Sequence, residues 1–438
     1  MQILNKEQLA GKDTFFDFLN SNAHYMAISG PPGTGKTFLL GQLSDIVLSE
    51  YKNTCTMLNI EPMYNQVIFA ATTNKAAAVL EDAINKPAKT IQSILSLRVT
   101  ENFKTGKTDL KPTDATMPID RSILFIDESS MIDTALYDII MEMTKTSKVI
   151  FVGDHAQLAP VLEKISPVYQ NLSPAFHIEL TEPVRNAGSP ALVTLCDQLR
   201  NSVETGKFHP IQEVPGSIDY LENDDAVIEK LQEYFVNSDG RARIVCYTNQ
   251  RVNEFNQAIR TLRNQPNKFQ VGEHLVVATA YARKKVFLNV EREVEVLEIS
   301  QSAKNGGYSD VGRKGESLEY YDITIRPKTG LRDIICAKLP VNRNVYNRII
   351  KRLSSQKLWP EYFTLKNEYI DLRGRDACTI YKSQGSTYEA VFLDLGNIGT
   401  SFDAEQVARS LFVAVSRAQK NVFLYGNLPQ KYIGTLAA

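Results

Sequence analysis

The chain has 438 residues, of which 43% are hydrophobic and 23% are charged, and its formal net charge is −1. This length suits two to four domains, and the composition excludes disordered and fibrous classes. The first residues, MQILNKEQLAGKDTF, lack the basic start and apolar core of a signal peptide, and no apolar run reaches the length of a membrane span. Five scattered cysteines without a Cys-x-x-Cys pair predict reduced thiols rather than zinc sites or disulfides. We therefore expect a cytoplasmic protein that does not act at a membrane.

The charge is unevenly distributed along the chain. Residues 279–375 contain 19 Lys and Arg against 12 Asp and Glu, and residues 324–357 contain nine basic residues against one acid, Asp333. Such a run is compatible with a solvated helix face and with a surface that follows phosphates. The charge alone favours the solvated helix face and leaves the phosphate surface as the alternative.

The stretch HYMAISGPPGTGKTFLLGQLSDIVL has the form of a strand, a glycine-rich loop and a helix. In this context the glycines let backbone N–H groups surround phosphate oxygens, and the helix N-terminus adds partial positive charge. Lys36 is expected to reach the β- and γ-phosphates, and the Thr37 hydroxyl to hold Mg²⁺. The residues predicted to bind the nucleotide are Gly30, Pro31, Pro32, Gly33, Thr34, Gly35, Lys36 and Thr37.

The tetrapeptide TGKT of this loop recurs at residues 105–108, within VTENFKTGKTDLKPTD. There Glu101 occupies the position of the first glycine, no apolar strand precedes it, and Pro112 soon follows. The second copy therefore predicts a polar hairpin or loop and no second phosphate site.

Short apolar stretches with helical patterns between most of them predict two α/β units with doubly wound parallel sheets. The first unit comprises residues 25–29, 67–71, 122–126, 148–152 and 177–180. The second comprises residues 243–247, 389–394 and 421–425, with a helical stretch at 251–263, and it lacks a phosphate loop.

Two acids, Asp127 and Glu128, end the stretch SILFIDE. Ligands of open α/β sheets bind at the carboxyl ends of strands. Asp127 is therefore a candidate Mg²⁺ ligand and Glu128 a candidate general base for the attacking water. Two exposed loop acids are the alternative, which the phosphate loop upstream disfavours.

Three further polar side chains follow later strands. Gln157 offers both a donor and an acceptor to a γ-phosphate or water, with a capping turn as the alternative. Arg185 and Arg417 are candidates for transition-state clamps, although an arginine taken alone is more often half of a surface ion pair.

A series of motifs occurs along the chain: LNKEQ, GPPGTGKT, ATTNKAAAVL, TIQSIL, FIDESSM, FVGDHAQLAPV, ELTEPVRN, IVCYTNQRVNEFN, CTIYKSQGSTYEAVFLDLG and LFVAVSRAQKNV. Their order resembles that of superfamily 1 helicases over nearly the whole length, with KSQGST and VAVSRA as the most specific motifs. Within that superfamily the chain is most similar to the 1B branch, the RecD-like helicases. Gln92 and Tyr381 depart from the pattern, because both stand where the family usually has histidine.

The resemblance implies a P-loop NTPase that uses ATP and Mg²⁺. It implies that Gln8 contacts adenine, that Gly385 lies near the nucleotide, and that Arg185 and Arg417 reach the γ-phosphate. The residues implied to lie along single-stranded DNA are Thr72, Thr73, Asn74, Ser93, Phe103, Thr379, Lys382 and Ser383.

The resemblance also implies an α/β fold of two RecA-like domains with two insertions. Domain 1A, with the ATP site, would comprise residues 1–95 and 119–195, and domain 2A residues 196–278 and 376–438. Residues 96–118 would form a strand-separating pin, domain 1B, in which Phe103 is a candidate wedge or else an exposed loop aromatic. Residues 279–375 would form an SH3-like β-barrel, domain 2B, and the alternating stretches REVEVLEI and YYDITIRP independently predict strands there. Because the basic residues 326–357 belong to this insert, we favour a contact with DNA or with the pin.

We expect an ATP-dependent DNA helicase that translocates on single-stranded DNA, 5′→3′ by family inheritance, and acts at junctions of single- and double-stranded DNA. The alternatives are a RecD-like motor subunit or translocase that needs a partner to unwind, an RNA-directed helicase, and a P-loop ATPase or nucleotide kinase that ignores nucleic acid. We expect a monomer, with a single-strand-binding or replication protein as a candidate partner. Replication, recombination and repair are not distinguished.

Overall fold

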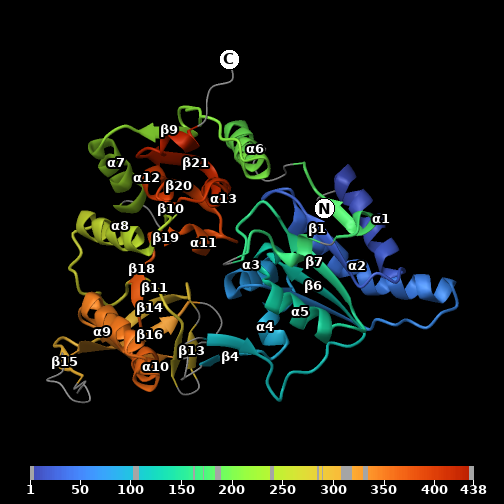
Figure 1. The fold of residues 1–438 in the computed structure, drawn as a ribbon, viewed down its shortest axis with the longest axis horizontal. Helices are drawn as coiled ribbons and strands as arrows, with labels where there is room; N and C mark the ends of the chain where they lie inside the picture. Colours follow the sequence, from blue (N-terminus) through green and yellow to red (C-terminus); the bar gives the residue numbers. More distant parts are fainter. Residues whose placement is uncertain are drawn as a thin grey trace.

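The computed structural model describes residues 4–101, 108–160, 163–170, 172–182, 189–236, 241–283, 286–288, 290–306, 318–328 and 334–433. Figure 1 shows three bodies: one α/β unit in blue and cyan, a second in green and red, and a β-rich body in yellow and orange. No helix within these ranges combines the length and the apolar content needed to cross a bilayer.

The first unit contains a six-stranded sheet in the order β3-β2-β6-β7-β1-β8, with all neighbours parallel. Its central strands are largely apolar because both faces of the sheet are covered, whereas the short edge strands carry polar residues. They are β1 (Tyr25–Ser29), β2 (Gln66–Ala71), β3 (Ala88–Thr90), β6 (Ser122–Asp127), β7 (Lys148–Gly153) and β8 (His177–Glu179). The helices of this unit are α1 (Lys6–Leu19), α2 (Lys36–Met57), α3 (Asn74–Ile84), α4 (Ile91–Ile94) and α5 (Thr134–Met143).

The second unit contains a five-stranded parallel sheet in the order β19-β10-β20-β21-β9. Its strands are β9 (Ile218–Leu221), β10 (Ala242–Cys246), β19 (Ala377–Thr379), β20 (Tyr388–Asp394) and β21 (Ala418–Tyr425). Its helices are α6 (Pro190–Thr205), α7 (Asp224–Leu231), α8 (Asn249–Leu262), α11 (Ile380–Ser383), α12 (Leu395–Ile398) and α13 (Ala404–Val415). The short strands β3, β9 and β19 were not among the predicted ones, because three or four residues carry too little periodicity to stand out.

Helix α6 shows where the chain passes from one unit to the other. Leu192, Leu195 and Leu199 on this helix are buried in the core of the second unit, against α13. The domain boundary expected at residue 195 therefore falls inside α6. The helix belongs to the second unit from its first turn, because its apolar face is buried there.

The third body is an antiparallel sheet in the order β15-β16-β14-β11-β18, with β17 paired to β16. Its strands are β11 (His274–Val277), β14 (Glu293–Ile299), β15 (Lys304–Asn305), β16 (Glu319–Pro327), β17 (Ile335–Pro340) and β18 (Leu372–Gly374). A separate short pair is formed by β12 (Tyr281–Arg283) and β13 (Val286–Leu288). Strand β11 lies before residue 279, so the sheet begins earlier in the chain than the insert boundary that the sequence suggested.

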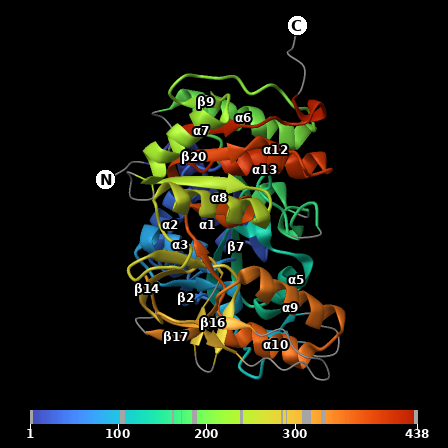
Figure 2. The same ribbon diagram turned by 90° about the vertical axis from the view of Figure 1, so that its left-hand side faces the viewer.

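Two helices, α9 (Arg343–Ser355) and α10 (Trp359–Glu368), pack beside this sheet (Figure 2). Of the basic residues within 326–357 that the structure describes, most lie on β16, β17 and α9. On α9 the apolar side chains of Tyr346, Ile349 and Leu353 are buried, so its polar and basic residues occupy the other face.

Of the second copy of TGKT, only Thr108 lies within the described residues, and the strands on either side of residues 102–107 form an antiparallel pair. Strands β4 (Arg98–Glu101) and β5 (Thr108–Lys111) pair antiparallel and extend from the first unit on the side of the third body (Figure 1). Phe103 and Gly106 lie outside the described residues.

Candidate active site

The glycine-rich loop between β1 and α2 has a backbone that only glycine adopts without strain. Gly30 has φ +151°, and a Cβ there would lie 2.1 Å from the carbonyl oxygen of Leu180. Gly33 and Gly35 have φ of 88° and 83°. Gly35 starts α2 without any side-chain cap, so the first N–H groups of this helix remain available to an anion. The predicted phosphate loop therefore has the geometry of an anion site.

Lys36 is folded back onto this loop. Its Nζ donates to the carbonyl oxygens of Gly30 at 2.7 Å and Pro31 at 2.8 Å. Burial lowers the pKa of Lys36, and the nearby carboxylates of Asp154, Asp127 and Glu128 act in the opposite direction. The ammonium group is thus held beside the loop by backbone contacts that phosphate oxygens can replace.

Asp127 and Glu128 lie at the carboxyl end of β6, as expected. Burial raises the pKa of Asp127 to about 7, with a further contribution from Glu128. Glu128 has φ 56° and ψ 40°, an unusual conformation for a residue other than glycine, and Thr72 Oγ1 donates to its carbonyl oxygen at 3.2 Å. Strain of this kind persists where the surroundings enforce it, and is commonest at functional sites.

The second unit reaches Glu128 directly. Gln384 Nε2 donates to Glu128 Oε2 and to Ser130 Oγ, each at 3.3 Å. A Cβ on Gly385 would lie 3.5 Å from Glu128 Oε1. Gly385 is therefore next to the candidate base, near the place that the sequence analysis gave it.

Arg417 is buried after α13, on the second unit. Its guanidinium donates to Val413 O at 3.1 Å and to Ser416 Oγ at 2.8 Å. Ser416 itself lines a small cavity whose other walls include three residues of the phosphate loop: Pro31, Pro32 and Thr34. Arg417 therefore lies one residue from a cavity that both units share, whereas Arg185 lies outside the described residues.

Gln157 and Asp154 lie on the loop after β7. Gln157 is 4% exposed, and its Oε1 has no hydrogen-bond partner within the described part of the chain. Asp154 is fully buried and accepts from Arg200 Nη1 at 2.7 Å. An unpartnered buried acceptor is uncommon in folded proteins and suits a group that meets a ligand.

Gln8 lies at the start of α1 and is buried. Its Oε1 accepts from Asn5 N at 3.1 Å, and its own N–H donates to Asn5 Oδ1 at 2.8 Å, which is a capping box. The carboxylate of the preceding residue, Glu7, accepts from the N–H of Thr181, and Thr181 lines the same small cavity as Pro31 and Pro32. Gln8 thus follows a residue that contacts a wall of the cavity beside the phosphate loop.

Comparisons with known proteins relate the chain to nucleotide-binding domains and helicases. The AAA domain family matches residues 4–214, and the UvrD-like helicase C-terminal domain family matches residues 376–425. The "ATP-dependent DNA helicase dda" of Enterobacteria phage T4 is 23% identical over 452 residues, which cover 92% of this chain and 95% of that protein. The RecBCD enzyme subunit RecD of Buchnera aphidicola is 30% identical over 154 residues, which cover 31% of this chain and 23% of that protein. These matches, together with the order of the motifs, support a relationship of the chain to the superfamily 1B helicases and to Dda.

A solved structure shows the same fold as this helicase. The Pif1 helicase from Bacteroides, in complex with ADP-AlF3 and single-stranded DNA, superposes with a TM-score of 0.51 at 16% identity, and the match covers all of this chain and 95% of that one. The two parallel sheets of the helicase thus form two RecA-like domains, with the phosphate loop in the first.

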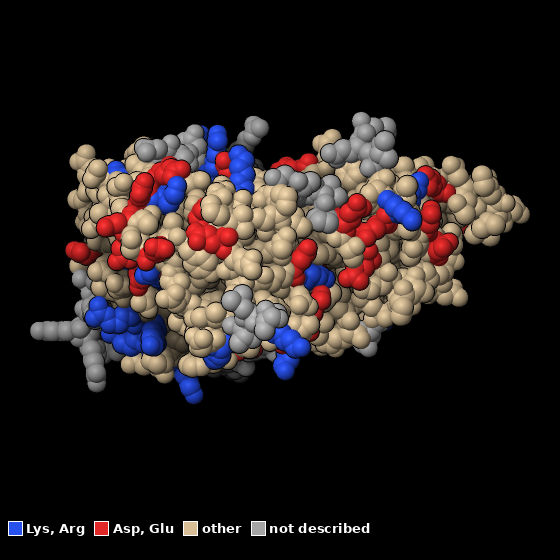
Figure 3. Space-filling view, turned by 90° about the horizontal axis from the view of Figure 1, so that it is seen from above, with Lys and Arg blue, Asp and Glu red and all other residues tan. Residues whose placement is uncertain are grey.

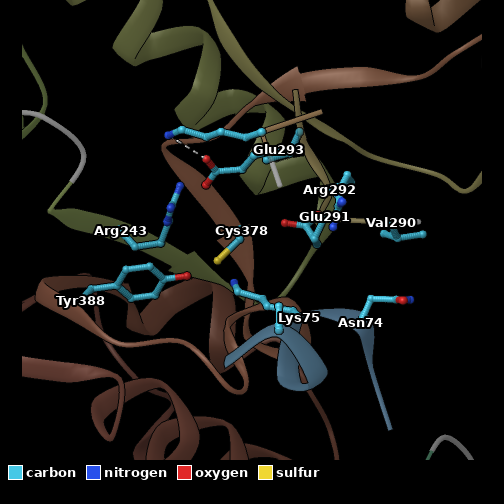
Figure 4. A pocket seen from close by; sticks show the side chains of 12 residues that line it. Asn74, Lys75, Arg243, Val290, Glu291, Arg292, Glu293, Cys378 and Tyr388 are labelled. Atoms are coloured by element: carbon cyan, nitrogen blue, oxygen red, sulfur yellow. Dashed lines mark hydrogen bonds and ion pairs between the residues drawn. The ribbon is translucent and has the colours of Figure 1, made fainter. Parts of the chain in front are cut away.

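The residues that the sequence analysis assigned to DNA divide into two groups. On the first domain, Thr73 caps α3 by accepting from Ala76 N at 3.1 Å, and Ser93 is exposed on α4. Asn74 and Lys75 line a cavity of about 190 Å³ that also has walls from the second domain and the third body. Figure 4 shows Asn74 and Lys75 on one side of this cavity and Arg243 and Tyr388 on another. These side chains are available to a ligand.

On the second domain only one of the three assigned side chains is accessible. Thr379 and Ser383 are buried, and the Ser383 hydroxyl donates to Ile380 O at 2.7 Å. Lys382 Nζ lies 3.0 Å from Glu291 Oε1, a carboxylate of the third body. Of the three side chains that were assigned to DNA in this motif, Lys382 is therefore the one that can reach a bound strand.

Sequence reasoning assigned no role to Gln384, although it lies in the quoted motif KSQGST. Its position between Thr379 and Gly385 was a signal, but its partner, Glu128, is 256 residues away in the chain. Lys75 was missed for a similar reason, because its cavity is completed by two other bodies.

Proposed function

We propose that this helicase is an ATP-driven motor that moves 5′→3′ along single-stranded DNA and unwinds duplex DNA ahead of it. One observation carries the proposal: Glu128, at the end of β6 in the first RecA-like domain, accepts a hydrogen bond from Gln384 of the second. A hydrolytic site that is shared between two domains changes when the domains move. Hydrolysis at such a site is therefore coupled to domain movement.

The chemistry of the site follows from its residues. The loop glycines and the N-terminus of α2 hold the phosphates, and Lys36 exchanges its carbonyl partners for the β- and γ-phosphate oxygens. Glu128 takes the proton of the attacking water. Arg417 and Arg185 neutralise the charge that develops on the transferred phosphoryl group, and Gln157 contacts that group or the water.

The residues present suit Mg²⁺. Thr37 and Asp127 offer hard oxygen atoms, and no group of three or more His, Cys, Asp and Glu that could hold a metal occurs within the described ranges. Mg²⁺ is typically held by one or two protein oxygens together with substrate phosphates. When bound, the ion would neutralise phosphate charge beside Asp127 and Glu128.

DNA binding is assigned to the surfaces around the three-body cavity. Asn74, Ser93 and Lys382 would contact the strand, with backbone contacts giving affinity without sequence preference. The exposed face of α9 adds basic residues, and we place DNA or pin contact there. On the face seen in Figure 3, Lys and Arg are interspersed with Asp and Glu, so binding would rest on local groups rather than on a global positive field.

The two insertions would serve strand separation. The hairpin of β4 and β5, within residues 96–118, is our candidate for the pin, with Phe103 as its wedge. The antiparallel third body would be the SH3-like domain. Its β strands and antiparallel pairing support this proposal.

The remaining assignments follow from the family. We propose a monomer in the cytoplasm, which acts on single-stranded DNA and on forks, with a single-strand-binding or replication protein as a candidate partner. An RNA-directed motor is the second candidate, because phosphate contacts do not by themselves discriminate against a 2′-hydroxyl.

Unwinding of four duplexes tests the proposal. They carry a 5′ single-stranded DNA tail, a 3′ DNA tail, no tail, or a 5′ RNA tail, with ATP and Mg²⁺ present and Glu128→Gln protein as control. We expect unwinding of the duplex with the 5′ DNA tail alone. Preference for the 3′ tail would overturn the direction, preference for the RNA tail would overturn the substrate, and DNA-stimulated hydrolysis without unwinding would indicate a translocase or a subunit that needs a partner.

A further inference from the structure

The loop that carries Gln157 is attached to both RecA-like domains. It leaves the first domain at the end of β7, yet the side chains of Ala156 and Leu158 are fully buried in the core of the second domain, among residues of α6 and α13. Residues 154–158 are therefore connected to one domain by the chain and packed into the other.

Arg409, on α13 of the second domain, holds the backbone of this loop. Its Nη1 donates to the carbonyl oxygens of His155 and Gln157, each at 2.6 Å. Glu405, one turn earlier on α13, accepts from Arg409 Nη2 at 2.8 Å and Nε at 3.0 Å, which fixes the guanidinium and balances its charge. Arg409 is only 7% exposed, and hydrogen bonds from a buried charged donor are among the stronger ones.

Helix α6 holds the same loop from another direction. Arg200 Nη1 donates to the buried carboxylate of Asp154 at 2.7 Å, and Arg200 Nε lies 3.0 Å from Glu204, which itself lies 3.7 Å from His155 Nε2. Two arginines on two packed helices of the second domain thus fix the loop at both of its ends.

The first domain contacts the chain where the loop begins, at Gly153. A Cβ on Gly153 would lie 2.7 Å from Ser129 Oγ and 2.6 Å from Tyr169 Oη, so the end of β7 packs closely on the residue that follows Glu128. A shift of residues 154–158 therefore displaces Ser129, the residue next to the candidate base, because a close-packed contact transmits displacement.

We infer that Arg409, assisted by Arg200, is a positioning residue that makes Gln157 follow the second domain. The inference rests on the proposed function and deepens it, because it assigns the coupling between hydrolysis and movement to named contacts. When the domains move relative to each other, the loop moves with the second domain, and the unpartnered Oε1 of Gln157 is carried toward or away from the phosphate loop.

The test compares Arg409→Ala with a matched variant, Arg263→Ala. Arg263 is the C-cap residue of α8 in the same domain and donates two hydrogen bonds to Asp376, at 2.7 and 2.8 Å, away from the loop. Each change removes an ion pair between an arginine and a carboxylate, so both are expected to lower thermal stability. The decisive quantity is the number of ATP molecules hydrolysed per base pair unwound, because a loss of folded protein lowers both rates equally and leaves their ratio unchanged.

We expect Arg409→Ala to raise this ratio about tenfold, Arg409→Lys to raise it less because an ammonium can keep one or two of the bonds, and Arg263→Ala to leave it unchanged. An unchanged ratio in Arg409→Ala, or an equal rise in Arg263→Ala, would overturn the inference. If Arg409→Ala does not fold, Arg409→Lys and Glu405→Gln give the same comparison.

Amide hydrogen exchange separates this inference from the proposed function. Without ATP or DNA, Arg409→Ala should exchange faster than the wild type at residues 154–158, with the phosphate loop unaffected. If Arg409→Ala exchanges faster but the wild type does not unwind DNA, the proposed function is contradicted while the role of Arg409 in holding the loop is supported. Unchanged exchange would contradict the inference itself.

Discussion

Gln384 of the second RecA-like domain donates a hydrogen bond to Glu128 of the first, with Nε2 and Oε2 3.3 Å apart. The same amide nitrogen lies 3.3 Å from Ser130 Oγ. The next residue is Gly385, where a Cβ would lie 3.5 Å from Glu128 Oε1. The motif that was expected to serve DNA thus also contacts the candidate base. A movement of the KSQGST motif relative to the first domain therefore changes the surroundings of Glu128.

Loss of this contact should reduce the response to DNA. We expect Gln384→Ala to lower the DNA-stimulated kcat for ATP about tenfold, since a hydrogen bond to a charged group contributes roughly 1.5–3 kcal/mol. Steady-state hydrolysis with and without single-stranded DNA measures the effect. Gln406→Ala, on α13 of the same domain, removes a hydrogen bond to Tyr381 Oη instead and is the control. An equal loss in both variants would contradict the role of Gln384.

Substitutions of Lys36 and Glu128 should impair different steps, ATP binding and ATP hydrolysis. Lys36→Ala removes the cation of the phosphate loop, and we expect it to weaken ATP binding as well as hydrolysis. Glu128→Gln should bind ATP normally and lower kcat by about 10²–10⁴-fold, because the general base is lost while the shape of the side chain is kept. Binding of a fluorescent ATP analogue and steady-state hydrolysis distinguish the two, with Glu142→Gln on the exposed side of α5 as control. Rapid hydrolysis by Glu128→Gln would exclude it as the base.

The ion pair between Glu291 and Lys382 should oppose DNA binding. Glu291 also accepts a hydrogen bond from Arg373, and although burial acts to raise its pKa, the charges of Arg373 and Lys382 outweigh this and lower it. We expect Glu291→Gln to free Lys382 and to raise the affinity for single-stranded DNA about threefold to tenfold, with a steeper salt dependence. Fluorescence anisotropy at several salt concentrations measures both. Glu319→Gln, on the exposed side of β16, should change neither, and weaker binding by Glu291→Gln would show that the pair supports the DNA site.

Phe103 should matter for strand separation more than for movement. If it is the wedge of the hairpin between β4 and β5, Phe103→Ala should slow unwinding at least about tenfold while translocation on single-stranded DNA stays within about twofold, because only the first needs base pairs to be opened. Displacement of streptavidin from a biotinylated strand reports translocation. Equal effects on the two rates would exclude Phe103 as the wedge.

Glu7 should stabilise the first domain in a pH-dependent way. The hydroxyl of Thr181 donates to its carboxylate, burial acts in the opposite direction, and the N–H groups of Glu182 and Thr181 donate at 3.1 and 2.8 Å, so that its pKa is lowered. Because a lowered folded-state pKa contributes stability above the unfolded value of about 4.3, that contribution is lost as the pH falls through the folded value. Glu7→Gln should therefore lower Tm at pH 7 and approach the wild type in acid. Asp13→Asn, exposed on the same helix, is the control, and a Tm difference that persists in acid would contradict the titration.

Much of the site could be predicted because it is local in the sequence. The loop glycines, Lys36 and the β6 acids lie within short motifs, and each motif sits where a buried strand meets a helix. Strand β1 was predicted with its observed bounds, and the other strands that the sequence analysis placed in the parallel sheets differ by one to three residues at one end or, for β10, by one residue at both ends. Contacts such as Arg409 to Gln157 were not predictable, because the donor and acceptor lie 252 residues apart and neither sits in a pattern that names the other.

The sequence by itself determined most strands of the two parallel sheets, the loop that is the candidate phosphate site and the family that the chain resembles, because hydrophobic period and glycine positions act over a few residues. The tertiary structure decided which units those segments join. It assigned α6 and β11 to different bodies than the boundaries suggested, because a helix or strand belongs where its apolar face is buried or its backbone is paired. It also decided which groups share a site, since Gln384 meets Glu128, and Arg409 meets the backbone of Gln157, only after two domains have packed against each other.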